Sequence, residues 1–168
     1  MRSTTDQRGQ TLVEFALIIP IVLLLMLGLF DLGRIVFTNN SLSDGARQGA
    51  RSGAIDPRDA SYCSLVDEAI RSAIRGQSLD IYTVTYITVN ATDDASGVET
   101  GSYLICQDGA DGPGKAALPI TAGPGDRVRV DLDADVDLAL GIIAQAAGQP
   151  TFSLHAESTM QVTFAPTN

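Results

Sequence analysis

An uninterrupted apolar block near the N-terminus constrains this chain of 168 residues more than any other feature. The block, Phe15–Phe30, carries no charged side chain. It would span about 24 Å as an α-helix, at a rise of about 1.5 Å per residue. Leu12 and Val13 lengthen it toward the roughly 30 Å hydrocarbon core of a bilayer. The sequence therefore predicts a transmembrane anchor helix at residues 10–37, with Arg34 beyond its apolar part.

Two other interpretations of this block stay open. Arg2 and Arg8 could form the basic region of a cleaved secretory signal. The apolar stretch is longer than the ~7–15 residues usual in such signals, and no A-x-A-like site follows it. A buried helix of a globular protein is the other alternative. The length of the block favours the membrane anchor.

The charges on either side of the block predict its orientation. The leader, residues 1–9, carries two arginines against one acidic residue, and long acidic domains translocate largely regardless of charge. Residues 1–37 hold three acidic and three basic side chains, so residues 38–168 carry the whole net charge of −9. We expect a cytoplasmic leader and an extracytoplasmic domain at residues 38–168.

The acidic balance of 20 Asp and Glu against 11 Lys and Arg also excludes some functions. A nucleic-acid partner would need a basic surface for phosphate contacts, which this composition does not supply. No phosphate-binding glycine loop, zinc site or other cofactor motif is present, and no small-molecule substrate is evident. The two cysteines, Cys63 and Cys106, both lie in the exported part, where an oxidising compartment favours a disulfide; two unrelated buried thiols are the alternative.

Helical periodicity continues beyond the anchor. A stripe of apolar and small residues extends over 31–53, and Asp59–Arg75 shows the i, i+3, i+4, i+7 pattern of an amphipathic helix that Gly76 ends. A short helix is expected at 140–147.

Four later segments are predicted as strands because they are rich in β-branched residues or alternate between apolar and polar side chains: 79–91, 102–107, 126–138 and 152–164. Since one face of each long strand is apolar, the expected fold class is α+β, with the amphipathic helix packed on an antiparallel sheet of three to four strands. On the last strand, the side chains expected to face the core are Phe152, Leu154, Ala156, Met160, Val162 and Phe164.

A catalytic set is not evident, and we expect no enzyme activity. His155, the one histidine, falls on the expected solvent face without a nucleophile motif beside it. The opposite face of strand 126–138 carries a row of carboxylates and is a weak candidate for Ca²⁺, although the EF-hand spacing is absent: Asp131, Asp133, Asp135 and Asp137. A solvated acidic face is the simpler interpretation, and the glycine-rich and proline-rich loop 108–125 carries no clearer motif.

The start of the anchor carries the informative motif. Gly9 precedes Gln10, and Glu14 stands five residues after Gly9, at the edge of the apolar block. This arrangement resembles the processing region of type IV prepilin-like proteins, in which cleavage follows a glycine and a glutamate lies five residues beyond the cut. The resemblance implies cleavage by a prepilin peptidase between Gly9 and Gln10 and an assembly role for Glu14. An interfacial position at headgroup level is the other interpretation of Glu14.

Residues 9–53 as a whole resemble the TadE-like family, components of the tight-adherence (Tad) pilus machinery. Phe15 stands where the tight-adherence subgroup often has Tyr. The features that carry the resemblance are Glu14-Phe15, Pro20, Gly33-Arg34 and the repeat Ala46-Arg47 to Gly49-Ala50-Arg51.

The resemblance implies a non-catalytic minor pilin or pseudopilin of a Tad (Flp-type) type IV pilus system, acting in pilus initiation, assembly and surface adherence. The implied partners are the membrane, other pilin-like or Tad machinery proteins and a prepilin peptidase. The implied location is the bacterial inner membrane, with the N-terminus inside and the C-terminal domain outside, or the pilus itself. The alternative is an anchored extracytoplasmic binding module that uses the acidic sheet face or the 108–125 loop, with Ca²⁺ as a candidate ligand.

Overall fold

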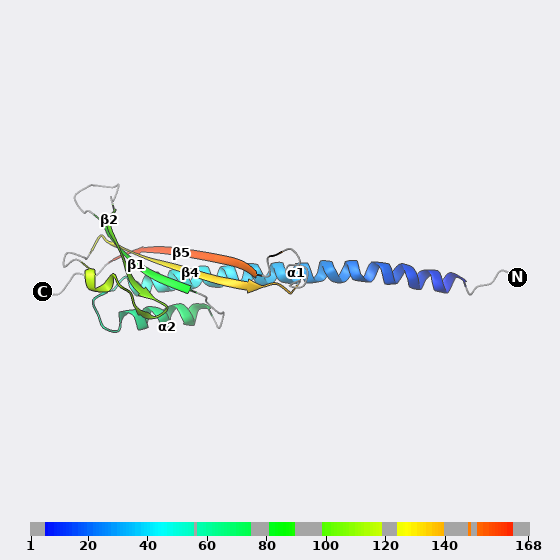
Figure 1. Ribbon diagram of the computed structural model, residues 1–168, viewed down its shortest axis with the longest axis horizontal. Coiled ribbons are helices and arrows are strands. Elements are labelled where there is room, and N and C mark those ends of the chain that lie inside the picture. Colours follow the sequence, from blue (N-terminus) through cyan, green and yellow to red (C-terminus); the bar gives the residue numbers. More distant parts are fainter. Residues whose placement is uncertain are drawn as a thin grey trace. The chain divides into compact units, whose positions relative to one another are not determined.

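The structure of the chain is a computed structural model that describes residues 6–55, 57–74, 81–89, 99–118, 124–139, 148 and 151–162. The chain divides into two compact units: residues 1–36 with 137–152, and residues 37–136 with 153–168. The elements follow in the order α1 (Asp6–Gly53), α2 (Tyr62–Ile74), β1 (Ile81–Val89), β2 (Glu99–Gln107), β3 (Ala110–Asp111), the 3-10 helix η1 (Lys115–Ala117), β4 (Arg127–Asp137) and β5 (Thr151–Gln161) (Figure 1).

Helix α1 is 48 residues long and includes both the predicted anchor and the small-residue stripe that follows it. Both predicted boundaries of the anchor, at residues 10 and 37, fall within this one helix. Pro20 lies inside the helix. Membrane helices tolerate such a proline, because neighbouring groups can satisfy the backbone carbonyl that it leaves free.

The strands form one antiparallel sheet in the order β3-β2-β1-β4-β5, which confirms the predicted α+β class with one strand more than the expected maximum. The extra strand is the two-residue β3, which is too short to show a periodicity in the sequence. In the register, Val84 of β1 lies opposite Cys106 of β2 and Val130 of β4. The predicted alternation of β4 is confirmed, since its apolar side chains are buried: Val128, Val130, Leu132, Ala134 and Val136.

Two helical segments cover the buried face of the sheet within the unit formed by residues 37–136 and 153–168. Leu42, Ala46 and Ala50 of α1 are fully buried, and so is Ile70 of α2. Gly49 allows the close approach: a Cβ built on it would stand 2.6 Å from Cγ1 of Ile70. The small residues of the stripe therefore let α1 contact α2 and β4 together.

Buried tyrosines connect the helices and the sheet through their hydroxyl groups. Tyr82 of β1 donates a hydrogen bond to the Asp67 carboxylate of α2 at 2.5 Å, and Tyr86 donates to the Asp126 carboxylate at 3.1 Å. The hydroxyl of Tyr62 donates to a carbonyl at the end of α1 at 2.8 Å. Burial raises the pKa of all three tyrosines, which stay neutral donors at physiological pH.

Strand β5 corrects part of the sequence-based assignment. Leu154, Ala156 and Val162 are buried as predicted, but Phe152 is 47% exposed and Met160 is 37% exposed. The alternation rule gives the face of a side chain, whereas burial also requires an element that covers it. Phe164 and the predicted helix at 140–147 lie outside the described residues. The predicted loop 108–125 contains β3 and η1.

Cys63 and Cys106 form a disulfide with a Cα–Cα distance of 5.6 Å, as the sequence predicts. The bond joins the first turn of α2 to β2. Both residues are buried, at 3% and 0% exposure. The packing of α2 on the sheet is therefore also held covalently.

Reduction of this disulfide is expected to lower the free energy of unfolding by about 4 kcal/mol, on the chain-entropy estimate for the loop that it closes. The two cysteines are 43 positions apart. Denaturant unfolding of the detergent-solubilised chain, with and without reductant, measures the difference. A Cys63→Ser/Cys106→Ser double variant is the control and must not respond to reductant. Equal midpoints for the oxidised and reduced wild type would contradict the prediction.

Gly49→Ala is expected to lower the free energy of unfolding by about 1–2 kcal/mol, because overpacking against Ile70 outweighs the higher helix propensity of Ala. Thermal unfolding followed by circular dichroism measures the change. Gly28→Ala is the matched control on the same helix, since nothing lies within 4 Å of a Cβ built there. An increase in stability at Gly49 equal to that at Gly28 would show that the contact is not tight.

Candidate functional site

The N-terminal part of α1 is long and apolar enough to cross a membrane, and none of its most apolar 18-residue window is buried by the described chain. Leu17, Leu25 and Leu29 are all more than 60% exposed. Exposure of large apolar side chains around a whole helix is stable only in an apolar environment, such as lipid or the helices of other subunits. This segment fits a membrane anchor, as the sequence predicts.

The predicted processing and assembly residues lie on the first turns of α1. The Gln10 side-chain amide donates a hydrogen bond of 3.2 Å to Oε1 of Glu14, one helical turn further along. Gly9 is exposed, it lies within α1, and nothing lies within 4 Å of a Cβ built on it. Because the Gln10 amide is neutral, it does not cancel the charge of Glu14. Processing and assembly at these residues stay predictions.

The first polar turn after the apolar segment is the point where α1 holds the end of β4. The backbone N–H of Ala139 donates to the Asp31 carboxylate at 2.7 Å. Nη1 of Arg34 donates to the carbonyl of Asp137 at 2.9 Å. Asp31 is only 6% exposed. These long-range contacts could not be read from the sequence, in which Arg34 was expected only to mark the end of the anchor.

The solvent face of β4 and β5 carries a row of charged and polar pairs. Nδ1 of His155 lies 2.8 Å from Oδ1 of Asp133, and its Nε2 lies 3.8 Å from Oδ1 of Asp131. The Ser153 hydroxyl donates to Asp135 at 2.6 Å. His155 is thus exposed as predicted, and it has carboxylate partners that the sequence does not indicate. The alternation of both strands predicts that these side chains share the solvent face. Which of them lie opposite one another depends on the register between β4 and β5, which the sequence does not reveal.

The ionisable groups of this row influence one another. The hydrogen bond to Asp133 raises the pKa of His155, against a smaller opposing effect of desolvation. Desolvation raises the pKa of Asp131, and the nearby Glu157 carboxylate adds to the rise. Nε of Arg129 forms an ion pair with Glu157 at 3.0 Å.

One group of side chains in this row could hold a metal ion. Single ligand atoms of Asp131, His155 and Glu157 lie within 4.8 Å of one another. Of the four aspartates that the sequence marked as weak metal candidates, only Asp131 belongs to this group; Asp133, Asp135 and Asp137 do not. Nε of Arg129 lies 3.0 Å from Oε1 of Glu157, so a cation would have to compete with this ion pair.

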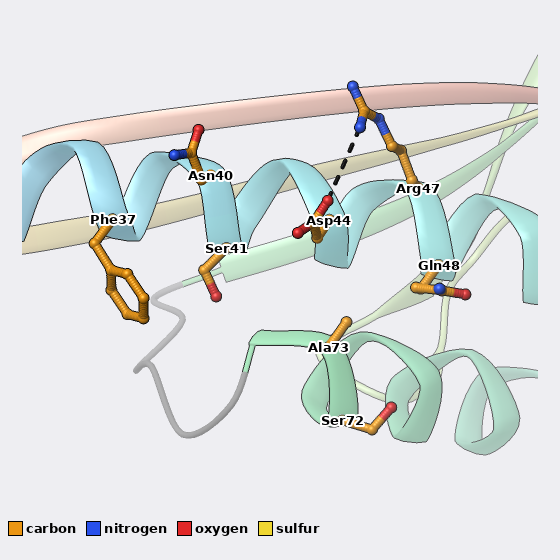
Figure 2. A pocket seen from close by; sticks show the side chains of 8 residues that line it. All are labelled: Phe37, Asn40, Ser41, Asp44, Arg47, Gln48, Ser72 and Ala73. Atoms are coloured by element: carbon orange, nitrogen blue, oxygen red, sulfur yellow. Dashed lines mark ion pairs between the residues drawn. The ribbon is translucent and has the colours of Figure 1, made fainter.

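A groove of about 550 Å³ lies between α1 and α2. Figure 2 shows the Asp44–Arg47 ion pair on its α1 side, at 3.9 Å, with Ser72 and Ala73 of α2 opposite. The Ser72 hydroxyl donates to a backbone carbonyl of its own helix, so it is not arranged as a nucleophile. The lining combines polar and apolar side chains: Phe37, Asn40, Ser41, Asp44, Arg47, Gln48, Ser72 and Ala73.

Comparison with known proteins gives a family match. Residues 9–51 match the family model described as TadE-like protein. This confirms the TadE-like resemblance over the apolar segment and the small-residue stripe of α1. No curated protein matches the chain, and no solved structure matches it.

His155→Gln is expected to reduce stability only at low pH. Because the pKa of His155 is raised in the folded state, its interaction with Asp133 stabilises the fold fully below the unfolded-state pKa of about 6.5. This contribution to stability is lost as the pH rises through the folded-state pKa. Because the side chains are exposed, the loss should stay below about 1 kcal/mol. Urea unfolding at about pH 5.5 and about pH 9 measures it. The control, Ser153→Ala, removes a neutral donor and should lower the free energy of unfolding by the same amount at both pH values. An equal loss at both pH values for His155→Gln would contradict the prediction.

Proposed function

We propose that this chain, whose residues 9–51 match the TadE-like family, is a membrane-anchored minor pilin or pseudopilin of a Tad-type pilus system. It acts without catalysis in pilus initiation and assembly, and through the pilus in surface adherence. The observation that carries the proposal is the matched helix itself. α1 joins an exposed apolar segment that begins with Gly9, Gln10 and Glu14 to a buried segment in the core of an α+β domain.

The continuity of α1 supports a subunit in which the first half of one helix serves as the membrane anchor and the second half belongs to a folded domain. The exposed apolar side chains extend from Leu12 to Phe37, and the first fully buried one is Leu42. The same helix is thus available to lipid or to other helices over its first half and committed to its own domain over its second. A subunit that exchanges lipid for neighbouring helices needs this division.

Glu14 supplies the assembly contact in this proposal. A carboxylate costs up to about 2.5–3.5 kcal/mol at the centre of a bilayer, and less near the interface. Its partner in the structure is the neutral amide of Gln10. Cleavage after Gly9 by a prepilin peptidase would create a cationic amine at Gln10, and the amine of a neighbouring subunit could then neutralise Glu14. The other partners are further pilin-like and Tad machinery proteins.

The proposed location is the bacterial inner membrane, with the leader inside and residues 38–168 outside. The arginines of the leader and the translocation of a long acidic domain support this orientation. The Cys63–Cys106 disulfide supports an oxidising compartment for the domain. Membrane-resident function and incorporation into the filament are both compatible with this topology.

A second candidate function is an anchored module that binds a divalent cation on the sheet. The proximity of Asp131, His155 and Glu157 favours it. Calcium titration followed by the thermal unfolding midpoint separates the two functions. A midpoint raised by Ca²⁺ in a chain that forms no complex with other pilins supports the binding module. Complexes without a response to Ca²⁺ support the pilin.

Glu14→Ala is expected to leave membrane insertion intact, since removal of a charge favours the bilayer. Recovery of the chain in crosslinked complexes with other pilins should fall several-fold, and pilus-dependent attachment should fall with it. Membrane fractionation, crosslinking and a surface-attachment assay measure the three effects. Leu17→Ala, an exposed site near the next turn, is the control for loss of side-chain volume.

Glu14→Gln separates charge from hydrogen bonding at the same position. If charge neutralisation drives assembly, this isosteric variant fails as Glu14→Ala does. Wild-type complexes and attachment in both variants would mean that Glu14 is only an interfacial residue.

A further inference from the structure

The turn that follows β4 is fixed at the level where α1 leaves its apolar segment. Asp31, the first charged residue after Phe30, accepts the hydrogen bond from Ala139, and Arg34 donates to the carbonyl of Asp137. Asp31 and Arg34 lie three positions apart and so share one side of the helix. Two hydrogen bonds therefore hold one short turn of backbone on a single helical turn of α1, within the unit of residues 1–36 and 137–152.

The position of that helical turn sets the depth of the β4 turn relative to a membrane. Leu12–Phe30 would span about 28 Å, close to the roughly 30 Å hydrocarbon core. Asp31 and Arg34 then lie within about 6 Å of its end along the helix. The headgroup region on each side of the core is about 5–7 Å thick by difference. The turn at Leu138–Ala139 therefore lies in the headgroup region when α1 spans the bilayer.

The side chains at this level fit a lipid surface. In a chain with a net charge of −9, the sequence from Leu138 to Leu154 contains no charged residue. Phe152, which the alternation pattern assigned to the core, is 47% exposed at the start of β5. Ser153 bonds to Asp135, so Phe152 lies next to the end of β4 that Arg34 holds. On α1, Leu32 is more than half exposed and continues the apolar surface of the anchor.

The burial of Asp31 also fits a position at the edge of the bilayer. A carboxylate at the edge of the hydrocarbon is costly unless it is hydrogen-bonded. Here the backbone of the β4 turn supplies a donor and helps to cover the group to 6% exposure. The turn thus removes the Asp31 carboxylate from the surface at this level. Arg34 bonds to the turn through one nitrogen and has further N–H donors suited to lipid phosphates.

We infer that Leu138, Ala139, Phe152 and Leu32 form a bilayer-contact surface that inserts into the phospholipid headgroups around the exit of α1. The inference rests on the membrane anchor of the proposed function and adds a second contact with the same membrane. The chain then contacts the bilayer both through the apolar segment of α1 and through the backbone turn at Leu138–Ala139, and the occupant of this surface is lipid.

Tryptophan fluorescence tests the inference, because the chain contains no natural Trp. Phe152→Trp is made in the full chain and reconstituted in vesicles of phosphatidylethanolamine and phosphatidylglycerol. Its quenching by phospholipids brominated near the glycerol end of the acyl chain is compared with that of Met160→Trp. Met160 is also partly exposed and lies about 27 Å further along the same strand. Leu24→Trp in the apolar segment reports the anchor itself.

The inference predicts several-fold stronger quenching for Phe152→Trp than for Met160→Trp, together with strong quenching of Leu24→Trp. Quenching of Leu24→Trp alone would overturn the bilayer-contact surface and leave the anchor intact. Absence of quenching for Leu24→Trp would overturn the anchor of the proposed function and the inference with it.

Two further measurements keep the test decisive. A blue-shifted but unquenched emission of Phe152→Trp that depends on the protein-to-lipid ratio would mean that a second copy covers the surface, which also overturns the inference. Mass mapping of the Cys63–Cys106 disulfide shows that each variant is folded. If Phe152→Trp lacks the disulfide, Leu138→Trp takes its place, with the same expected quenching.

Discussion

The close contact of α1 with α2 and β4 is the interaction on which the rest of the fold depends. Gly45 and Gly49 have no side chain where Ile74 and Ile70 approach the helix. Ala46, which lies between the two glycines in the sequence, is fully buried. Larger side chains on this stripe would push α2 away from the sheet. The disulfide and the Tyr82–Asp67 hydrogen bond could then not hold α2 where they do.

The same helix has two different environments along its length, and its sequence changes accordingly. Large aliphatic residues occupy every side of Phe15–Phe30, where contact with lipid or with other helices is not directional. Small residues occupy one side of the later part, where a single pair of neighbours must approach closely. The polar turn at Asp31 and Arg34 separates the two parts, and both of its charged side chains bond to backbone at the end of β4 or just after it. The proposed pilin role and the proposed lipid contact both depend on this division.

The two faces of the sheet also differ in what they contribute. The inner face is apolar and is covered by helices, and it accounts for the folded domain. The outer face of β4 and β5 holds its charges in pairs, such as His155 with Asp133 and Arg129 with Glu157. Pairing of exposed charges at the surface contributes little stability. It also explains why His155 has an altered pKa without any catalytic partner among the described residues.

The sequence by itself determined the features that depend on local periodicity and composition. These are the apolar segment of α1, the amphipathic helix α2, the one-sided strand β4 and the match of residues 9–51 to the TadE-like family. Periodicity is a property of neighbouring residues, so a single sequence is enough to reveal it.

Only the tertiary structure decided which of these elements meet. Three of its features join residues that are far apart in the chain: the strand order, the pairing of His155 with Asp133 and the hydrogen bond from Ala139 to Asp31. The exposure of Phe152 depends on which element covers it. Each requires the register between strands and the placement of a helix on a sheet. The packing of the whole domain fixes these relations, and no local pattern of residue types encodes them.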